Sequence, residues 1–173
     1  MIANHSLKLF FSLKEMGPAI KVAEQIVQYV PSTCVSPKAD TVLFNYNVGR
    51  IYIHFHRFAE ADESLSKAFD QCLKDSFQNK QRILMYLVVT RMIRGKIPTD
   101  QLLQKYGLHN SFSKLVTHYK TGNMAGFLME LEAKKEFMLK HGFYLIMLHR
   151  TQILLYRNLF SRMYLVDDAT LTL

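Results

Sequence analysis

Apolar residues recur at steps of three and four along most of this 173-residue chain, which is the spacing of helices with one buried face. The first such stripe, in residues 2–16, stops before Gly17 and Pro18. The same spacing predicts further helices over residues 18–30, 40–55, 58–74, 79–94, 100–106, 111–121, 124–140 and 143–166. Residues 31–37 contain two prolines and read as a loop. We therefore expect an all-α fold, a right-handed solenoid of helical hairpins.

The last residues depart from the helical pattern. Asp167 and Asp168 are expected to end the long helix 143–166. Residues 170–173 then alternate polar and apolar side chains, as the start of a strand does.

Residues 45–69 contain the clearest pair of helices. Small and large side chains alternate there as in tetratricopeptide hairpins, with Gly49 and Tyr52 on the first helix and Ala61, Leu65 and Ala68 on the second. Gly49 and Ala61 leave room for close approach of two backbones, while Tyr52 and Leu65 fill the remaining space. A single hairpin cannot bury its own apolar face, so neighbouring hairpins should cover it.

Charge is distributed unevenly along the chain. The net charge is +8 and the pI is near 9.5, which favours acidic partners such as nucleic acid or an acidic peptide. Residues 74–105 hold seven Lys and Arg against two Asp. A solvated helix face is the ordinary explanation for such a segment. Among the cations outside it, Arg150, Arg157 and Arg162 lie loosely along one side of the last helix, and they are the best candidates for nucleic-acid contact.

The sequence holds no pattern for catalysis, for a metal or for a cofactor. His54 and His56 are two positions apart and would face different directions on a helix. The other histidines and the two cysteines show no zinc-binding spacing, and no P-loop, dinucleotide fingerprint or nucleophile elbow occurs. The longest apolar runs are far below the roughly 20 residues that a membrane span needs. We expect a soluble, intracellular, non-enzymatic protein without a small-molecule substrate.

Residues 78–108 carry a resemblance to a known family. Their sequence, QNKQRILMYLVVTRMIRGKIPTDQLLQKYGL, resembles the PCI-domain family of the proteasome lid, the signalosome and translation-initiation assemblies. More narrowly, it is similar to the PCI-domain subunits of the nuclear mRNA-export (TREX-type) complex. The resemblance extends over residues 42–166, and its most distinctive part is the run YRNLF at residues 156–160.

The resemblance implies a tetratricopeptide-like arm, residues 1–142, that leads into a winged helix beginning at residues 143–173. It implies no enzymatic activity and no cofactor. The implied partners are a large PCI-containing scaffold subunit, a small acidic disordered protein, and RNA or DNA through the complete winged helix. The implied location is the nucleus, at the nuclear pore, with some protein in the cytoplasm. An acidic partner would suit the basic segment, which contributes Lys80, Arg82, Arg91, Arg94 and Lys96.

The chain departs from the family pattern because the recognition helix and the wing are missing, so we expect an incomplete winged-helix module. Two alternatives stay open. One is a signalosome-associated PCI subunit. The other is a stand-alone tetratricopeptide-like module that binds peptides in a groove, although the apolar Val48 and Ile51 at groove positions favour burial.

Overall fold

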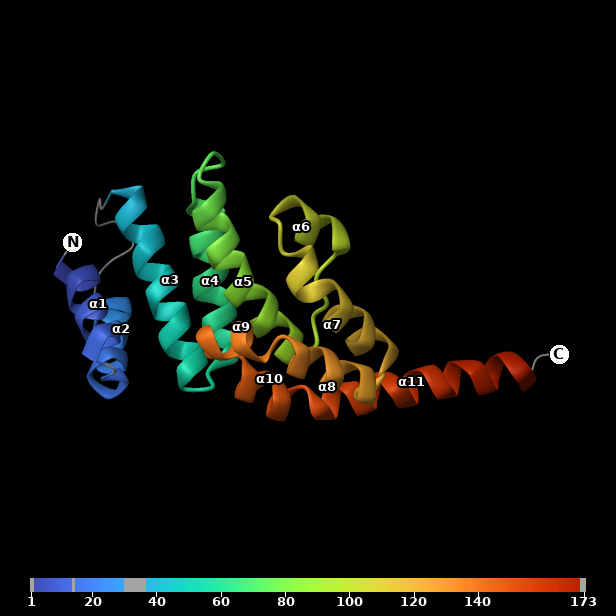
Figure 1. The fold of residues 1–173 in the computed structure, drawn as a ribbon. Coiled ribbons are helices and arrows are strands. Elements are labelled where there is room, and N and C mark those ends of the chain that lie inside the picture. The colour runs from blue at the N-terminus through green and yellow to red at the C-terminus, as the bar shows by residue number, and fades with distance from the viewer. Residues whose placement is uncertain (1, 14, 30–36, 172–173) are drawn as a thin grey trace. The chain divides into compact units, whose positions relative to one another are not determined.

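The computed structural model of this chain describes residues 2–13, 15–29 and 37–171. Within these residues it consists of helices joined by turns and bends, with no strand, which confirms the predicted all-α fold (Figure 1). The chain divides into two compact units, Met1–Thr90 and Arg91–Leu173. The domain boundary expected between residues 142 and 143 stays a prediction.

The first unit is built from two helical hairpins and the beginning of a further helix. α1 (Ile2–Leu13) pairs with α2 (Met16–Tyr29), and α3 (Lys38–His54) pairs with α4 (Phe58–Gln71). The first part of α5 (Phe77–Ile93) completes the unit.

The start of α2 lies two residues before the expected position. Pro18 lies in the first turn of α2, as expected, but this turn also includes Met16 and Gly17, which were expected to lie before the helix. Proline is tolerated there because the first N–H groups of a helix have no partner within it. The predicted loop 31–37 lies outside the described residues, except for Pro37 at the start of α3.

The side chain of Leu65 on α4 packs directly on the bare Gly49 of α3. Gly49 is buried, and a Cβ atom added to it would lie 2.5 Å from Cγ of Leu65. Tyr52, Ala61 and Ala68 are buried as well. The structure thus places all five residues of the tetratricopeptide-like pattern in the interior of this unit. Val48 and Ile51 are also buried, at 1% and 0% exposure, and so do not line a groove.

Arg57, in the turn before α4, ties the two hairpins together. Its guanidinium pairs with Glu24 of α2 and, at 2.9 Å, with Glu60 of α4. Hydrogen bonds to these two carboxylates raise the pKa of Arg57.

The second unit contains the end of α5 and six further helices. They are α6 (Asp100–Lys105), α7 (His109–Thr121), α8 (Met124–Ala133), α9 (Lys135–Lys140), α10 (Tyr144–Arg150) and α11 (Gln152–Leu171). α11 packs on α7, α8 and α10, and its second half extends beyond α7 and α8 (Figure 1).

Two helices that were expected to be continuous are each divided. The expected helix 124–140 changes direction at Lys134, whose backbone has φ −106° and ψ 17°. The Lys134 ammonium donates to the carbonyl of Ser111 at 3.2 Å and pairs with Glu130 at 2.8 Å, which ties this point to the start of α7. The expected helix 143–166 bends at the buried Thr151, whose hydroxyl donates to the Met147 carbonyl at 2.6 Å. Such bonds compete with the helical ladder.

The expected strand at the C-terminal end is wrong as far as the structure describes it. α11 continues through Asp167 and Asp168 to Leu171, and residues 172–173 lie outside the described part. In a helix the backbone N–H and C=O groups pair with one another, whereas in a strand without a neighbouring strand these groups would stay unpaired. The cost of two aspartates in a helix, up to about 0.7 kcal/mol each, does not reverse that preference.

Candidate nucleic-acid and partner interface

The turn after α5 presents two exposed cations, Arg94 and Lys96, on either side of Gly95. Gly95 has a positive φ of 79°, and the N–H of Lys96 donates to the carbonyl of Arg91 at 2.8 Å. This is the usual hydrogen-bond pattern where a helix ends at glycine. Both side chains therefore leave the backbone near the negative end of the α5 dipole, where cations are favoured.

Arg157 of α11 lies against the same turn. A Cβ atom placed on Gly95 would be 3.2 Å from Nη1 and 3.3 Å from Nη2 of Arg157. The guanidinium therefore covers the bare glycine, and a third exposed cation joins the two on the turn. We call Arg94, Lys96 and Arg157 the α5-end cluster.

Contacts between α7 and α11 hold Arg157 in this position. The side-chain amide of Asn158 donates to the carbonyl of Tyr119 at 2.8 Å, and its oxygen accepts from Arg157 Nη2 at 3.2 Å. The hydroxyl of Tyr119 in turn donates to the carbonyl of Met92 at 2.8 Å. Burial raises the pKa of Tyr119, with Arg157 acting in the opposite direction, so the phenol keeps the proton that it donates. The end of α5, α7 and α11 are thereby connected.

The five cations expected to contact an acidic partner are divided between the two units. Lys80 is buried, and its ammonium donates to the carbonyl of Phe69 at 3.1 Å and lies 4.6 Å from the centre of that ring. Lys80 therefore supports packing of α5 on α4. Arg82 is exposed in the first unit, whereas the half-buried Arg91 belongs to the second unit with Arg94 and Lys96.

The three arginines expected along one side of the last helix lie on two different helices. Arg150 ends α10, before the bend at Thr151, whereas Arg157 and Arg162 lie on α11. Five residues on a helix correspond to a rotation of about 140°, so Arg157 and Arg162 point in different directions. All three are exposed, and Arg157 is the one that lies against Gly95, between Arg94 and Lys96 in the chain.

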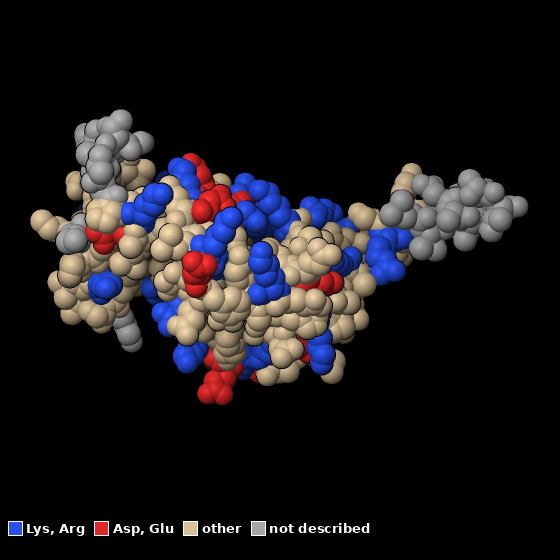
Figure 2. Space-filling model, turned by 90° about the horizontal axis from the view of Figure 1, so that it is seen from above, with Lys and Arg blue, Asp and Glu red and all other residues tan. Residues whose placement is uncertain are grey.

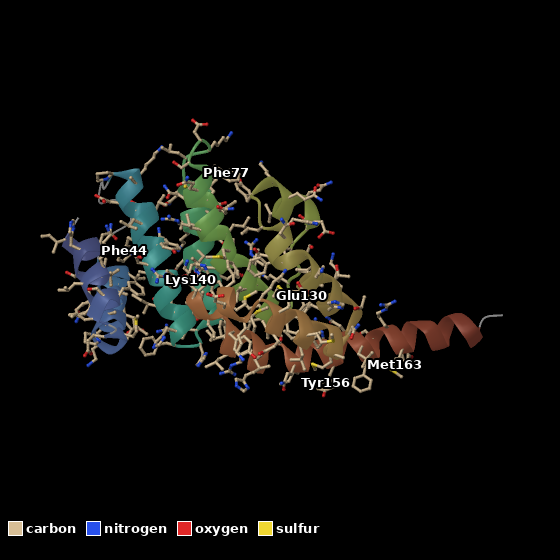
Figure 3. All side chains as sticks on the ribbon, viewed as in Figure 1. Phe44, Phe77, Glu130, Lys140, Tyr156 and Met163 are labelled. Atoms are coloured by element: carbon tan, nitrogen blue, oxygen red, sulfur yellow. The ribbon has the colours of Figure 1, made fainter. Side chains whose placement is uncertain are left out.

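An exposed apolar stripe follows the outer side of α11. Ile153, Tyr156, Phe160 and Met163 recur at steps of four and three, and their exposures are 79%, 52%, 64% and 54% (Figure 3 labels Tyr156 and Met163). Leu155 faces the opposite way and is 1% exposed. Spacing alone showed two apolar faces and did not show which one α7 covers.

Net charge is concentrated in the second unit. Residues 91–173 hold 12 Lys and Arg against 6 Asp and Glu, whereas residues 1–90 hold 10 against 8. Figure 2 shows Lys and Arg side chains spread over the viewed face, with Asp and Glu side chains between them. The second unit is therefore the more favourable one for a polyanion.

The described residues contain no group of three His, Cys, Asp or Glu that could hold a metal ion. His54 ends α3, and His56 lies in the following turn with a positive φ of 60°. Among the described helices none is long and apolar enough to cross a membrane.

Comparison with known proteins finds relatives that match nearly the whole chain. No family model matches the chain, but individual proteins do. A PCI domain-containing protein of Schizosaccharomyces pombe is 31% identical over 166 residues, which are 95% of this chain and 38% of that protein. PCI domain-containing protein 2 of Xenopus laevis is 31% identical over 168 residues, which are 95% of this chain and 41% of that protein.

The chain is thus similar to PCI domain-containing proteins over most of its length. The enhanced ethylene response protein 5 of Arabidopsis thaliana is similar as well. It is 31% identical over 129 residues, which are 75% of this chain and 31% of that protein. The chain thus spans about two fifths or less of the length of these relatives.

Proposed function

We propose that this chain is part of a non-enzymatic PCI-type scaffold subunit of a nuclear mRNA-export complex. In that role it assembles with a large PCI-containing scaffold subunit and a small acidic disordered protein, and it contributes to nucleic-acid binding. The proposed location is the nucleus, at the nuclear pore, with some protein in the cytoplasm.

The observation that carries the proposal is similarity to PCI domain-containing proteins over 95% of this chain. The narrower export role rests on the resemblance of residues 78–108 and 156–160 to the export-complex subunits. The α5-end cluster supports the nucleic-acid part, because three exposed cations on one side of a positively charged unit attract phosphates. Burial of Val48 and Ile51 argues against the alternative of a peptide-binding groove at these positions.

Affinity purification from nuclear extract tests the assembly. With the tagged chain as bait, we expect recovery of a large PCI-containing subunit together with a small acidic protein. Mass spectrometry identifies the recovered proteins, and an unrelated helical-repeat protein of similar charge serves as the control bait. Recovery of signalosome, proteasome-lid or initiation-factor subunits in their place would overturn the export role.

Charge reversal in the α5-end cluster tests the nucleic-acid contact. Arg157→Glu should weaken binding to a fluorescent single-stranded RNA by roughly tenfold at low salt and reduce the slope of log K against log salt by about one unit. Arg162→Glu should have a smaller effect, because Arg162 points in a different direction from Arg157 on α11. Fluorescence anisotropy over a salt series measures both quantities.

Lys21→Glu provides the matched control, since Lys21 is an exposed cation of the less charged first unit. Thermal melting checks that each variant is folded. Equal RNA binding by Arg157→Glu and Lys21→Glu at every salt concentration would exclude the cluster from the contact.

A further inference from the structure

A cavity of about 330 Å³ lies within the first unit, between α3, the end of α4 and the beginning of α5. Its lining comes from three segments that are far apart in sequence: residues 38–46, 71–73 and 76–83. The sequence pattern gave no sign of it. A volume of this size is at the lower end of the range of ligand-binding clefts and is sufficient for one large side chain.

The interior of the cavity is apolar. Its lining includes Val42 and Leu43 of α3 and Ile83 of α5, and the thiol-bearing Cys72 is buried in the wall. Tyr46 adds an aromatic ring, which meets the ring of Tyr86 edge-on at 5.6 Å. Burial, together with Tyr86, raises the pKa of Tyr46 to about 12, so the phenol is neutral at physiological pH. A wall of this kind favours an apolar group and disfavours an ionised one.

Cations and neutral polar groups occur among the other lining residues. Lys38 and Arg82 are exposed, and the described residues that line the cavity include no Asp or Glu. Gln71 and Asn79 offer amide groups that can pair with a peptide backbone. The cavity therefore combines an apolar interior with a positive, hydrogen-bonding surround.

Exposed apolar surface continues outside the cavity. Leu73, at 67% exposure, lines it, and Phe77, at 47%, lies in the chain between the lining residues Ser76 and Asn79 (Figure 3 labels Phe77). This surface extends beyond what a compact small molecule would cover. It suits a chain that places one side chain inside and continues over the edge.

We infer that this cavity anchors a peptide segment that presents one large apolar side chain flanked by carboxylates. The apolar side chain fills the space between Val42 and Ile83, and the carboxylates pair with Lys38 and Arg82. Buried anchors of this kind supply most of the energy of many protein interfaces. The inference rests on the proposed function only in one respect, that the segment belongs to the small acidic partner.

A synthetic peptide tests the inference directly. The chain contains no Trp, so a 12-residue peptide with one central Trp among Asp and Glu residues carries the only indole in the mixture. We expect its fluorescence to shift to the blue on binding, as the ring leaves water. Replacing this Trp by Ala in a fluorescein-labelled version should weaken binding by about a hundredfold. Replacing its carboxylates by Lys should abolish binding.

Two variants of the chain locate the site. Ala39→Phe adds an aromatic ring at an exposed lining position and should block the cavity, and Arg82→Glu should weaken binding by about tenfold. Lys21→Glu, which makes the same charge change away from the cavity, should bind the peptide normally. In a Cys34→Ser background the peptide should also slow alkylation of Cys72 by N-ethylmaleimide, since Cys72 is then the only cysteine.

The outcomes separate this inference from the proposed function. Unchanged peptide affinity in both Ala39→Phe and Arg82→Glu, with circular dichroism showing that they are folded, would overturn the site. So would equal affinity for the Trp and Ala peptides. If Ala39→Phe still recovers the acidic partner from nuclear extract, the cavity is not the anchor but the proposed function stands. If the unmodified chain recovers no export-complex subunit yet binds the peptide, the proposed function fails and the site remains.

Discussion

Gly122→Ala is expected to destabilise the second unit by about 3 kcal/mol, with α11 as the helix that loosens first. Gly122 ends α7 with φ 68°, where a side chain costs roughly 1–2 kcal/mol. In addition, a Cβ atom here would lie 2.4 Å from the backbone nitrogen and 2.5 Å from Cα of Leu159. Backbone atoms cannot rotate away as a side chain can, so α11 must move, at a cost of about 1–3 kcal/mol.

Gly142→Ala separates the cost of the positive φ from the cost of the contact with Leu159. Gly142 has nearly the same conformation, with φ 73°, but nothing lies within 4 Å of the added Cβ atom. It should therefore show the conformational cost alone, roughly 1–2 kcal/mol. Urea denaturation gives the free energies of unfolding, and amide hydrogen exchange in residues 152–160 reports on α11. Equal destabilisation by the two substitutions would contradict the close contact of α7 with α11.

Gly49→Leu is expected to destabilise the first unit by about 3 kcal/mol. Its Cβ atom alone would lie 2.5 Å from Cγ and 2.8 Å from Cδ2 of Leu65, and Leu65 is fully buried. Neither helix can give way without opening the interior that α3 and α4 share, and overpacking of this kind costs typically 1–3 kcal/mol. Thermal melting and urea denaturation measure the loss.

A double-mutant cycle shows whether Leu65 causes the effect. Leu65→Ala alone should cost about 2–5 kcal/mol, since it empties a buried site. Gly49→Ala should be destabilising in the original chain but neutral or stabilising after Leu65→Ala, because the methyl group then enters the vacated space. Gly17→Ala is the control, since nothing lies within 4 Å of that position. Additive effects of Gly49→Ala and Leu65→Ala would rule out the contact.

Helix existence and several helix ends could be predicted because they depend on near neighbours in sequence. Gly95 and Gly122 end α5 and α7 as expected, since a positive φ is readily adopted by glycine. The bends at Lys134 and Thr151 were missed. The Lys134 side chain reaches a carbonyl 23 residues away, and the helical spacing of apolar residues continues through Thr151 without a sign of its bond to Met147.

The sequence could predict which types of residue form the candidate site, but not which of these residues lie together. Arg94, Lys96 and Arg157 were each selected as cations, but were assigned to two different partners. Their meeting at Gly95 depends on the contact of α11 with α7, through Asn158 and Tyr119, which are 39 residues apart. Lys80 was selected by the same reasoning and is buried against Phe69. The distribution of charge along the sequence therefore identified candidate binding cations, whereas burial in the structure showed which of them are accessible.

The sequence by itself determined the all-α class, the hairpin with Gly49 and Leu65, and the excess of positive charge, because each depends on local spacing or on composition. Only the tertiary structure decided which side of α11 is buried, which cations lie together, and that a cavity opens between α3, α4 and α5. These features arise from contacts between segments distant in sequence, and the period of apolar residues along one helix does not specify its neighbours.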